Sequence, residues 1–205
     1  MPTFDLFSVG HSNVAADDFV AMLKHAGVDM IADIRSMPHS RRHPWFSKKN
    51  LEILLERSGV GYLMMGDTLG GRPRDEGLYR EGIADYETMA RTPLYQTGLD
   101  RLMELARRGR VCVMCAEREP LDCHRCLLVA RSLAERGLSA GHILHDGSIE
   151  PHALTEQRLL ALYGKSCDLF ASGQREALTA AYRRRASDVA FRQKIRASTS
   201  AADKR

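Results

Sequence analysis

The stretch that decides the fold is Val111-Cys112-Val113-Met114-Cys115-Ala116-Glu117, followed after a short connection by Asp122-Cys123-His124-Arg125-Cys126. Its first part is an apolar run with β-branched residues, which predicts a buried strand. Its second part begins with Asp122, a good helix N-cap, and apolar residues then recur from Leu127 at helical spacing. Four of the five cysteines of the chain fall in these two segments. We therefore expect thiols, an imidazole and a guanidinium at a strand-loop-helix junction.

The same alternation of strands and helices runs through the first three quarters of the chain. Strands are predicted over residues 4–9, 30–34, 61–65, 111–115 and 140–144, and helices over 17–25, 48–57, 84–90, 93–107 and 123–136. A loop rich in glycine and charge is predicted over 66–82. Such alternation is typical of βαβ units, so we expect an α/β fold: a mostly parallel five-stranded sheet with helices on both faces.

After Gly147 the pattern is helical only, with helices expected over 151–163 and 174–195. The chain is thus divided into an α/β domain, residues 1–150, and a helical C-terminal extension, residues 151–205. The end of that extension is rich in Ser, Ala and basic residues, which predicts a disordered tail from about residue 197.

Length, charge and cysteine use limit the class of protein. The chain has 205 residues, enough for one such domain with an appendage, and its formal net charge of +4 does not by itself imply nucleic-acid binding. The first ten residues contain Asp5 and no basic cluster, and no later apolar run has the length of a membrane span. An odd cysteine count without a secretory signal favours reduced thiols. We expect a cytoplasmic protein that has no membrane partner.

Polar residues follow the predicted strands at the points where these end. His11 and Ser12 follow the first strand, Arg35 closes the second, and Cys115 and Glu117 close the fourth. In a parallel α/β sheet, ligands bind at the carboxyl ends of the strands. We therefore expect these side chains to converge on one cleft.

Several short motifs resemble those of a known family, the domain-of-unknown-function 488 family. They are Gly10-His11-Ser12, Asp33-Ile34-Arg35-Ser36 with Arg41-Arg42, Leu69-Gly70-Gly71-Arg72, Met114-Cys115-Ala116-Glu117 and Cys123-His124-Arg125. The resemblance runs roughly from residue 4 to 152 and implies a cytosolic protein, without implying a particular activity. Cys112 and Cys126 lie outside the family's pattern.

The junction can supply an activated thiolate. A helix N-terminus, a guanidinium and an imidazole each stabilise the thiolate of Cys115 or Cys123, so either cysteine can act as a nucleophile or redox centre. Residues predicted to take part in catalysis are Cys115, Glu117, Cys123 and His124. Residues predicted to bind an anionic substrate are His11, Ser12, Arg35, Arg41, Arg42 and Arg125. Cys112 and Cys126 are expected to be core thiols.

Two alternative roles for the cysteines and Arg125 stay open. The Cys-x-x-Cys pairs have the spacing of zinc ligands, but strand alternation places Cys112 and Cys115 on opposite faces of the sheet. A partial metal site made of Cys115, Cys123 and His124 with His11 remains open. Arg125 can either bind an anion or pair with an acidic residue and hold the loop.

The loop over residues 36–50 bears on the substrate. It carries four basic residues, two histidines and the tryptophan, but no acid, a mixture that suits a phosphate backbone and a stacked base. Burial of Trp45 and Phe46 in the core is an equal alternative. The sequence favours an enzyme for a phosphate-bearing substrate, either a nucleotide or nucleic acid. The alternative is a non-catalytic nucleic-acid-binding or regulatory module with a structural metal or redox-sensing cluster. No cofactor and no oligomeric state are predicted.

Overall fold

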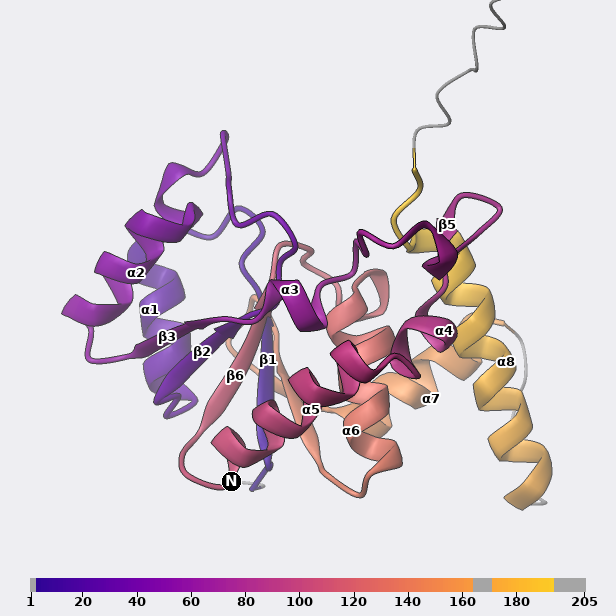
Figure 1. Cartoon of the computed structure of the whole chain (residues 1–205). Helices are drawn as coiled ribbons and strands as arrows, with labels where there is room; N and C mark the ends of the chain where they lie inside the picture. Colours follow the sequence, from indigo (N-terminus) through magenta and orange to yellow (C-terminus); the bar gives the residue numbers. More distant parts are fainter. Residues whose placement is uncertain (1–2, 164–170, 194–205) are drawn as a thin grey trace, which may run out of the picture.

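A computed structural model of the chain describes residues 3–163 and 171–193, and its centre is a six-stranded sheet (Figure 1). The strand order is β3-β2-β6-β1-β7-β8, with every neighbouring pair parallel except β7 and β8. The strands are β1 Leu6–Gly10, β2 Met30–Asp33, β3 Gly61–Met64, β6 Val111–Cys115, β7 Ala140–Ile143 and β8 Ile149–Pro151. The predicted α/β class is confirmed.

The central strands β1 and β6 are buried along their whole length because helices cover both faces of the sheet (Figure 1). On one face, Phe7 and Met114 pack in a core with α1 and α2. On the other face, Leu6 and Val113 pack with α5 and the helices that follow β6. The helices of the first 110 residues are α1 Ala16–His25, α2 Lys48–Arg57, α3 Gly66–Leu69, α4 Tyr86–Ala90 and α5 Pro93–Ala106.

The later helices all pack on the second face. A π-helical segment, Arg125–Ala130, continues into α6 Arg131–Glu135, and α7 His152–Leu162 follows the sheet. The long helix α8, Ala171–Val189, lies against α7 and contributes Tyr182 to the core (Figure 1). The second core thus contains residues of the C-terminal extension as well as of the sheet.

Two details differ from the sequence prediction. A sixth strand, β8, pairs antiparallel with β7; it has three residues and follows a tight turn, so it has no alternating pattern to predict it. The loop over 66–82 contains α3 and the first strand of a small hairpin, β4 Tyr79–Arg80 and β5 Ile83–Ala84. The predicted tail from residue 197 lies outside the described residues.

The expected helix N-cap at Asp122 is also wrong. Asp122 ends a 3-10 turn, Pro120–Asp122, and its carboxylate pairs with Arg185 of α8. The backbone of Cys123 is still extended, and the helical segment begins at Arg125. The N-cap of the short turn is Glu119, whose carboxylate accepts a hydrogen bond from the Leu121 amide at 3.2 Å. Asp122 therefore joins the turn to α8 through Arg185 and does not cap a helix.

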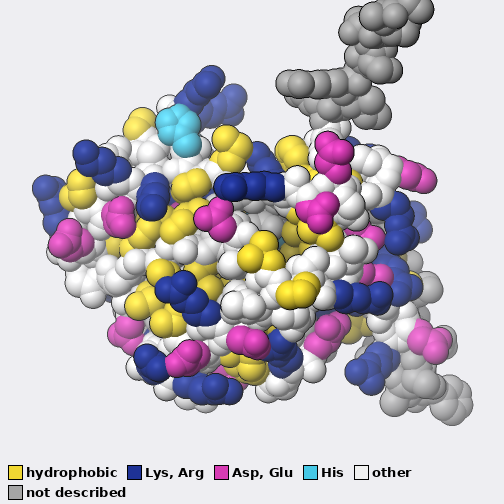
Figure 2. All heavy atoms as spheres, in the orientation of Figure 1, with side chains coloured by type: hydrophobic (Ala, Val, Ile, Leu, Met, Phe, Trp, Pro, Cys, Tyr) yellow, Lys and Arg dark blue, Asp and Glu magenta, His cyan; other side chains and the backbone are white. Residues whose placement is uncertain are grey.

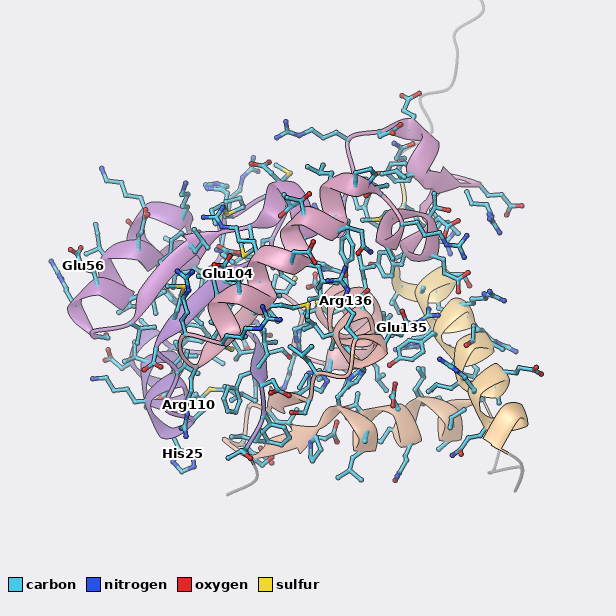
Figure 3. The ribbon with its side chains drawn as sticks, turned by 60° about the horizontal axis from the view of Figure 1, so that its bottom comes forward. His25, Glu56, Glu104, Arg110, Glu135 and Arg136 are labelled. Carbon is cyan, nitrogen blue, oxygen red and sulfur yellow. The ribbon has the colours of Figure 1, made fainter. Side chains whose placement is uncertain are left out.

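Charged side chains at the amino-terminal edge of the sheet stabilise the ends of its helices and strands (Figure 3). Arg136, which ends α6, pairs with Asp100 of α5. The amide of Arg110 donates to Asp29 at 2.8 Å and joins the starts of β6 and β2. On the face in Figure 2, basic and acidic groups are interspersed, and basic groups with a histidine gather where the loop between β2 and α2 projects. No helix in the described part of the chain is long and apolar enough to cross a membrane.

Candidate functional site

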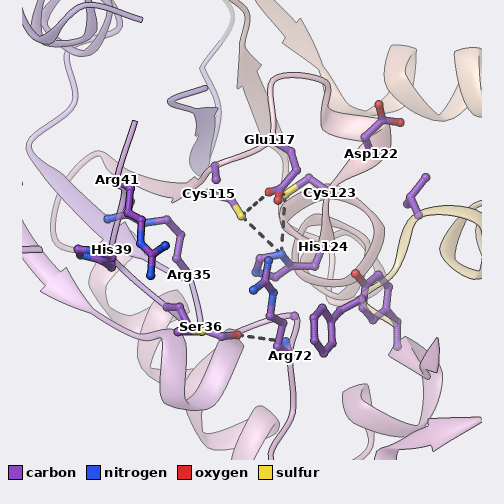
Figure 4. A pocket seen from close by; sticks show the side chains of 16 residues that line it. Arg35, Ser36, His39, Arg41, Arg72, Cys115, Glu117, Asp122, Cys123 and His124 are labelled. Carbon is purple, nitrogen blue, oxygen red and sulfur yellow. Dashed lines mark hydrogen bonds between the residues drawn. The ribbon is translucent and has the colours of Figure 1, made fainter. Parts of the chain in front are cut away.

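A pocket of about 640 Å³ opens at the carboxyl edge of the sheet, beside the ends of β2 and β6 (Figure 4). Loops that follow β2, β3 and β6 form its walls, and the residues just after α8 close one side. Its lining residues are Arg35, Ser36, Met37, His39, Arg41, Gly71, Arg72, Tyr86, Cys115, Ala116, Glu117, Asp122, Cys123, His124, Val189 and Phe191.

Four of these residues form what we call the pocket cluster: Cys115, Glu117, Cys123 and His124 (Figure 4). The Cys115 thiol lies 2.8 Å and the Cys123 thiol 3.2 Å from Oε2 of Glu117. The sulfurs of Cys115 and Cys123 lie 3.6 and 3.8 Å from Nδ1 of His124. All four predicted catalytic residues are thus brought together, and Glu117 is the one that is not buried.

The imidazole of His124 is held in one orientation. Its Nε2–H donates to the carbonyl of Ile34 at 3.1 Å, which in the neutral ring leaves the lone pair of Nδ1 facing the two thiols. The ring packs against Gly71, where a Cβ atom would lie 2.7 Å from Cγ of the imidazole. A side chain at position 71 would therefore displace His124, which explains the glycine in Leu69-Gly70-Gly71-Arg72.

The two thiols of the pocket cluster have opposite pKa shifts. Burial, together with the neighbouring Cys123 and Glu117, raises the pKa of the Cys115 thiol well above its usual range. Burial opposes ionisation of Cys123 as well, but contacts with Cys115, Arg125 and His124 outweigh it and lower the pKa of Cys123. The pKa of His124 is raised, because the Cys123 and Glu117 charges outweigh its burial. Of the two sulfurs, Cys123 is therefore the one whose surroundings favour the thiolate.

Arg125 lies behind the pocket cluster and holds its loop. Its side chain is 0% exposed, and its guanidinium donates to the carbonyls of Glu117 and Arg118, the latter at 2.8 Å. Its backbone amide points at the sulfur of Cys123 at 3.4 Å. A Cβ at Gly10 would lie 1.7 Å from the Glu117 carbonyl, so glycine is required there. Of the two roles left open for Arg125, the contacts show the loop-holding one; the guanidinium does not line the pocket.

Arg35 lines the pocket, but its charge is already paired. It donates through Nε and Nη2 to the carboxylate of Asp33 at 2.8 and 2.6 Å, and through Nη1 to the carbonyl of Phe46 at 2.8 Å. Nη1 also donates to Nε2 of His11 at 3.1 Å. Burial and the charge of Arg35 lower the pKa of His11 to about 4, so His11 is neutral and stacks on Phe46. His11 therefore supports Arg35 from behind rather than lining the pocket.

The basic loop reaches the pocket with some of its residues only. Arg41 and His39 line the pocket, whereas Arg42 does not. Ser12, which follows β1 and was also predicted to bind substrate, does not line the pocket either. Phe46 is fully buried, and the indole N–H of Trp45 donates to the carbonyl of Val14 at 3.2 Å. The aromatic residues of the loop are thus used for packing.

Three residues that shape the site were not among the predicted site residues. Arg72 lines the pocket and stacks on Phe191, with its guanidinium carbon 4.8 Å from the ring centre. Its place directly after Gly70-Gly71 was the available signal. Phe191 gave no signal, because it follows a helix far along the chain. Asp33, which orients Arg35, closes β2 and had the same strand-end signal as Arg35.

A second group of thiol and imidazole side chains, the inner cluster, lies in the core: Cys126, His142 and His152. Nδ1 of His142 is 2.6 Å from the Ser8 hydroxyl, and its Nε2 is 3.0 Å from Nδ1 of His152. Nε2 of His152 is 3.0 Å from the hydroxyl of Tyr182. Burial lowers the pKa of His152 to about 4 and that of His142 well below its usual value. Both rings are neutral.

Comparison with known proteins gives one finding. The sequence model of the family described as "Domain of unknown function DUF488" matches residues 15–132, more than half of the chain. The chain belongs to this family, and the resemblance predicted from its motifs is confirmed. No curated protein and no solved structure matches the chain.

Proposed function

We propose that this member of the DUF488 family is a cytoplasmic enzyme that acts on a phosphate-bearing substrate, a nucleotide or nucleic acid, at a cysteine-dependent centre. One observation carries the proposal: two thiols, an imidazole and a carboxylate lie together at a pocket whose walls also bear arginines. The free state of the four described cysteines supports a reducing compartment.

The anion-binding part of the proposal rests on Arg41 and Arg72. Both are exposed and line the pocket. Arg41 makes no hydrogen bond or ion pair with another described residue. Arg72 forms no ion pair with another described residue, and its contact with the ring of Phe191 orients the guanidinium. A guanidinium binds phosphate oxygens through two parallel N–H groups. Asp122 also lines the pocket, but its charge is compensated by Arg185.

The second candidate is the non-catalytic nucleic-acid-binding or regulatory module. It is favoured by the loop between β2 and α2 and by the start of α2. Arg41 and Arg42 of the loop and Lys48 and Lys49 of the helix are all exposed, and Met37 is 68% exposed. Such a surface binds a phosphate backbone without chemistry. In this candidate the pocket cluster would be a structural metal or redox-sensing site. We rank it second because such a site has no need of a pocket whose walls bear arginines.

The anion site is tested by titrating the purified protein with inorganic phosphate and with a nucleoside monophosphate in a calorimeter. We expect Arg41→Ala and Arg72→Ala each to weaken phosphate binding by about tenfold, the value of one charge-assisted hydrogen bond. Arg42→Ala is the matched control, because Arg42 is the exposed neighbour that does not line the pocket. Equal affinity in all four proteins would refute the anion site.

The cysteine-dependent centre is tested by labelling the purified protein, kept free of metal by a chelator, with iodoacetamide and mapping the products by mass spectrometry. We expect Cys123 to react first near neutral pH, since its pKa is lowered, and Cys112 to stay unlabelled in the folded protein, since it is 0% exposed with a raised pKa. Phosphate should slow labelling of Cys123. Labelling of Cys112 as fast as Cys123 would contradict the proposal.

A further inference from the structure

We propose that the pocket cluster, Cys115, Glu117, Cys123 and His124, binds one zinc ion. The inference deepens the proposed function, since it gives the two cysteines of the same pocket their role: they would hold a metal rather than attack the substrate themselves. It rests on four observations, which concern distances, the imidazole, the carboxylate and charge.

The distances among the ligand atoms fit a tetrahedral ion. The four atoms all lie within 4.8 Å of one another. Zinc binds sulfur at about 2.3 Å and nitrogen at about 2.0 Å, so a sulfur and a nitrogen on the same tetrahedral ion are about 3.6 Å apart. The sulfurs of Cys115 and Cys123 lie 3.6 and 3.8 Å from Nδ1 of His124. The sulfur and nitrogen ligands are therefore already spaced for zinc.

The imidazole is prepared as a ligand. Metal-bound histidines donate their other ring N–H to a carbonyl or carboxylate, which fixes the tautomer and the ring. Nε2 of His124 donates to the carbonyl of Ile34 at 3.1 Å, and Gly71 lets the ring lie in this position. In this tautomer Nδ1 carries no proton, and its lone pair faces the two sulfurs.

The carboxylate accepts from both thiols, and once a thiol ionises the two anions lie too close to each other without a cation. Oε2 of Glu117 is 2.8 Å from Cys115 and 3.2 Å from Cys123, so a thiolate there requires a positive charge near the three atoms. Both cysteines line the pocket but are buried, at 3% and 2% exposure, so a small ion reaches their sulfurs more easily than a bulky substrate does. On a zinc ion the oxygen would sit about 3.5 Å from each sulfur. Glu117, which is not buried, is the group that can make this small adjustment.

The charge balance also fits a divalent ion. Two thiolates and one carboxylate leave a zinc complex with one negative charge, and the buried guanidinium of Arg125 lies beside Cys123. Any thiol that is protonated beforehand releases its proton to solvent when its sulfur binds the ion. A set of two sulfurs, one imidazole and one carboxylate selects zinc over the oxygen-preferring cations.

Because Glu117 faces the pocket, it is the ligand that a substrate oxygen or water can replace (Figure 4). An open or exchangeable position is what separates catalytic zinc sites from closed structural ones. A phosphate oxygen bound there would lie in the same pocket as Arg41 and Arg72.

The test uses the purified full chain, first dialysed against a chelator and then titrated with zinc. We expect one zinc per chain by elemental analysis. Cys115→Ser and Cys123→Ser should each weaken zinc binding by more than about a hundredfold, which exceeds the loss caused by removing a group that only orients a ligand. Glu117→Gln should weaken it by about tenfold. The matched controls are Cys112→Ala, from the same strand as Cys115, and Cys126→Ala, from the helical segment that follows Cys123. Both should keep the wild-type affinity.

Cobalt replacement gives a second readout, which is independent of whether a serine variant folds. Co²⁺ added to the metal-free wild type should give strong thiolate-to-cobalt absorption in the near ultraviolet. Less than one zinc per chain, a cobalt spectrum without that absorption, or an equal loss of affinity in Cys126→Ala would each overturn the zinc site.

The outcomes separate the metal site from the proposed function. If no zinc binds but Arg41→Ala still weakens phosphate binding, the zinc site fails and the anion pocket stands. If one zinc binds through the two cysteines while phosphate affinity is equal in all variants, the zinc site stands and the proposed substrate class fails.

Discussion

The pocket cluster and the inner cluster both combine thiols with imidazoles, but their surroundings differ. The segment that follows β6 contributes Cys123 and His124 to the first cluster and Cys126 to the second. In the inner cluster each ring nitrogen of His142 and His152 already has a protein partner, and all three side chains are buried. In the pocket cluster two sulfurs share one carboxylate oxygen, and that carboxylate faces a pocket. The ring nitrogens of the inner cluster are thus all hydrogen-bonded within the protein, whereas the pocket cluster is open to a ligand from the pocket.

Proton positions sharpen this contrast. Tyr182 donates to Glu156 at 2.9 Å, so the Tyr182 oxygen accepts from Nε2–H of His152. Nδ1 of His152 then accepts from Nε2–H of His142, and Nδ1 of His142 accepts from the hydroxyl of Ser8. Each proton in this row has one place, and both rings are neutral. The row joins β1, β7, α7 and α8, so we expect its role to be stability.

The largest effect is expected at Arg125, which lies between the two clusters. Arg125→Met removes a fully buried guanidinium and leaves the carbonyls of Glu117 and Arg118 without this donor, so it should lower the free energy of unfolding by about 3 kcal/mol or more. Urea denaturation in the presence of a chelator measures this without a contribution from bound metal. Arg118→Met, at the exposed neighbour, is the control and should cost less than about 0.5 kcal/mol. Similar losses in both variants would contradict the role of Arg125 as the support of the loop.

The next effect is acid destabilisation through the inner cluster. The pKa of His152 is about 4 in the folded protein and about 6.5 when unfolded, so the unfolded chain takes up the proton first as the pH falls. The stabilisation is complete above about pH 6.5 and is lost as the pH falls toward 4, an effect of about 3 kcal/mol. Urea denaturation across this range measures it.

A matched variant isolates His152 from the other histidines. His11 has the same pKa shift and His142 one in the same direction, so the wild-type slope contains all three. His152→Gln should be less stable at pH 7.5 and should lose less stability on acidification than the wild type. An unchanged slope would mean that His152 is protonated in the folded protein.

A smaller effect is expected from Tyr182→Phe, which removes the hydroxyl between His152 and Glu156. The ring stays in the core, while the N–H of His152 loses its partner, so the loss should be about 1–2 kcal/mol. Tyr163→Phe is the control, because the hydroxyl of Tyr163 bonds to Asp188 at the surface, and it should change stability by less than about 0.5 kcal/mol. Zinc affinity should be the same in both variants. A loss of zinc binding in Tyr182→Phe would show that the two clusters are coupled.

The two clusters also differ in how far sequence could predict them. Cys115, Glu117, Cys123 and His124 are at most nine positions apart along the chain and close a strand or open a helical segment, so local patterns predicted their meeting. His142, His152 and Tyr182 come from β7, α7 and α8, and nothing in their spacing indicates contact. Sheet order was equally hidden, because β6 inserts between β1 and β2 through long-range pairing. The role of Arg125 depended on loop carbonyls, which no side-chain pattern encodes.

The smallest effect on stability is expected at the pocket rim. Arg41 is exposed and forms no hydrogen bond or ion pair with other described residues, so Arg41→Ala should change the free energy of unfolding by less than about 0.5 kcal/mol without ligand. With phosphate at about ten times its Kd, the wild type should gain about 1.4 kcal/mol, and the variant clearly less, because its weaker binding leaves the site partly empty. Thermal unfolding with and without phosphate measures both, and Arg42→Ala should behave as the wild type. Equal gains in all three proteins would show that phosphate stabilises the fold from another site. Phosphate binding would then no longer support the view that the pocket cluster, unlike the inner cluster, lies at a ligand site.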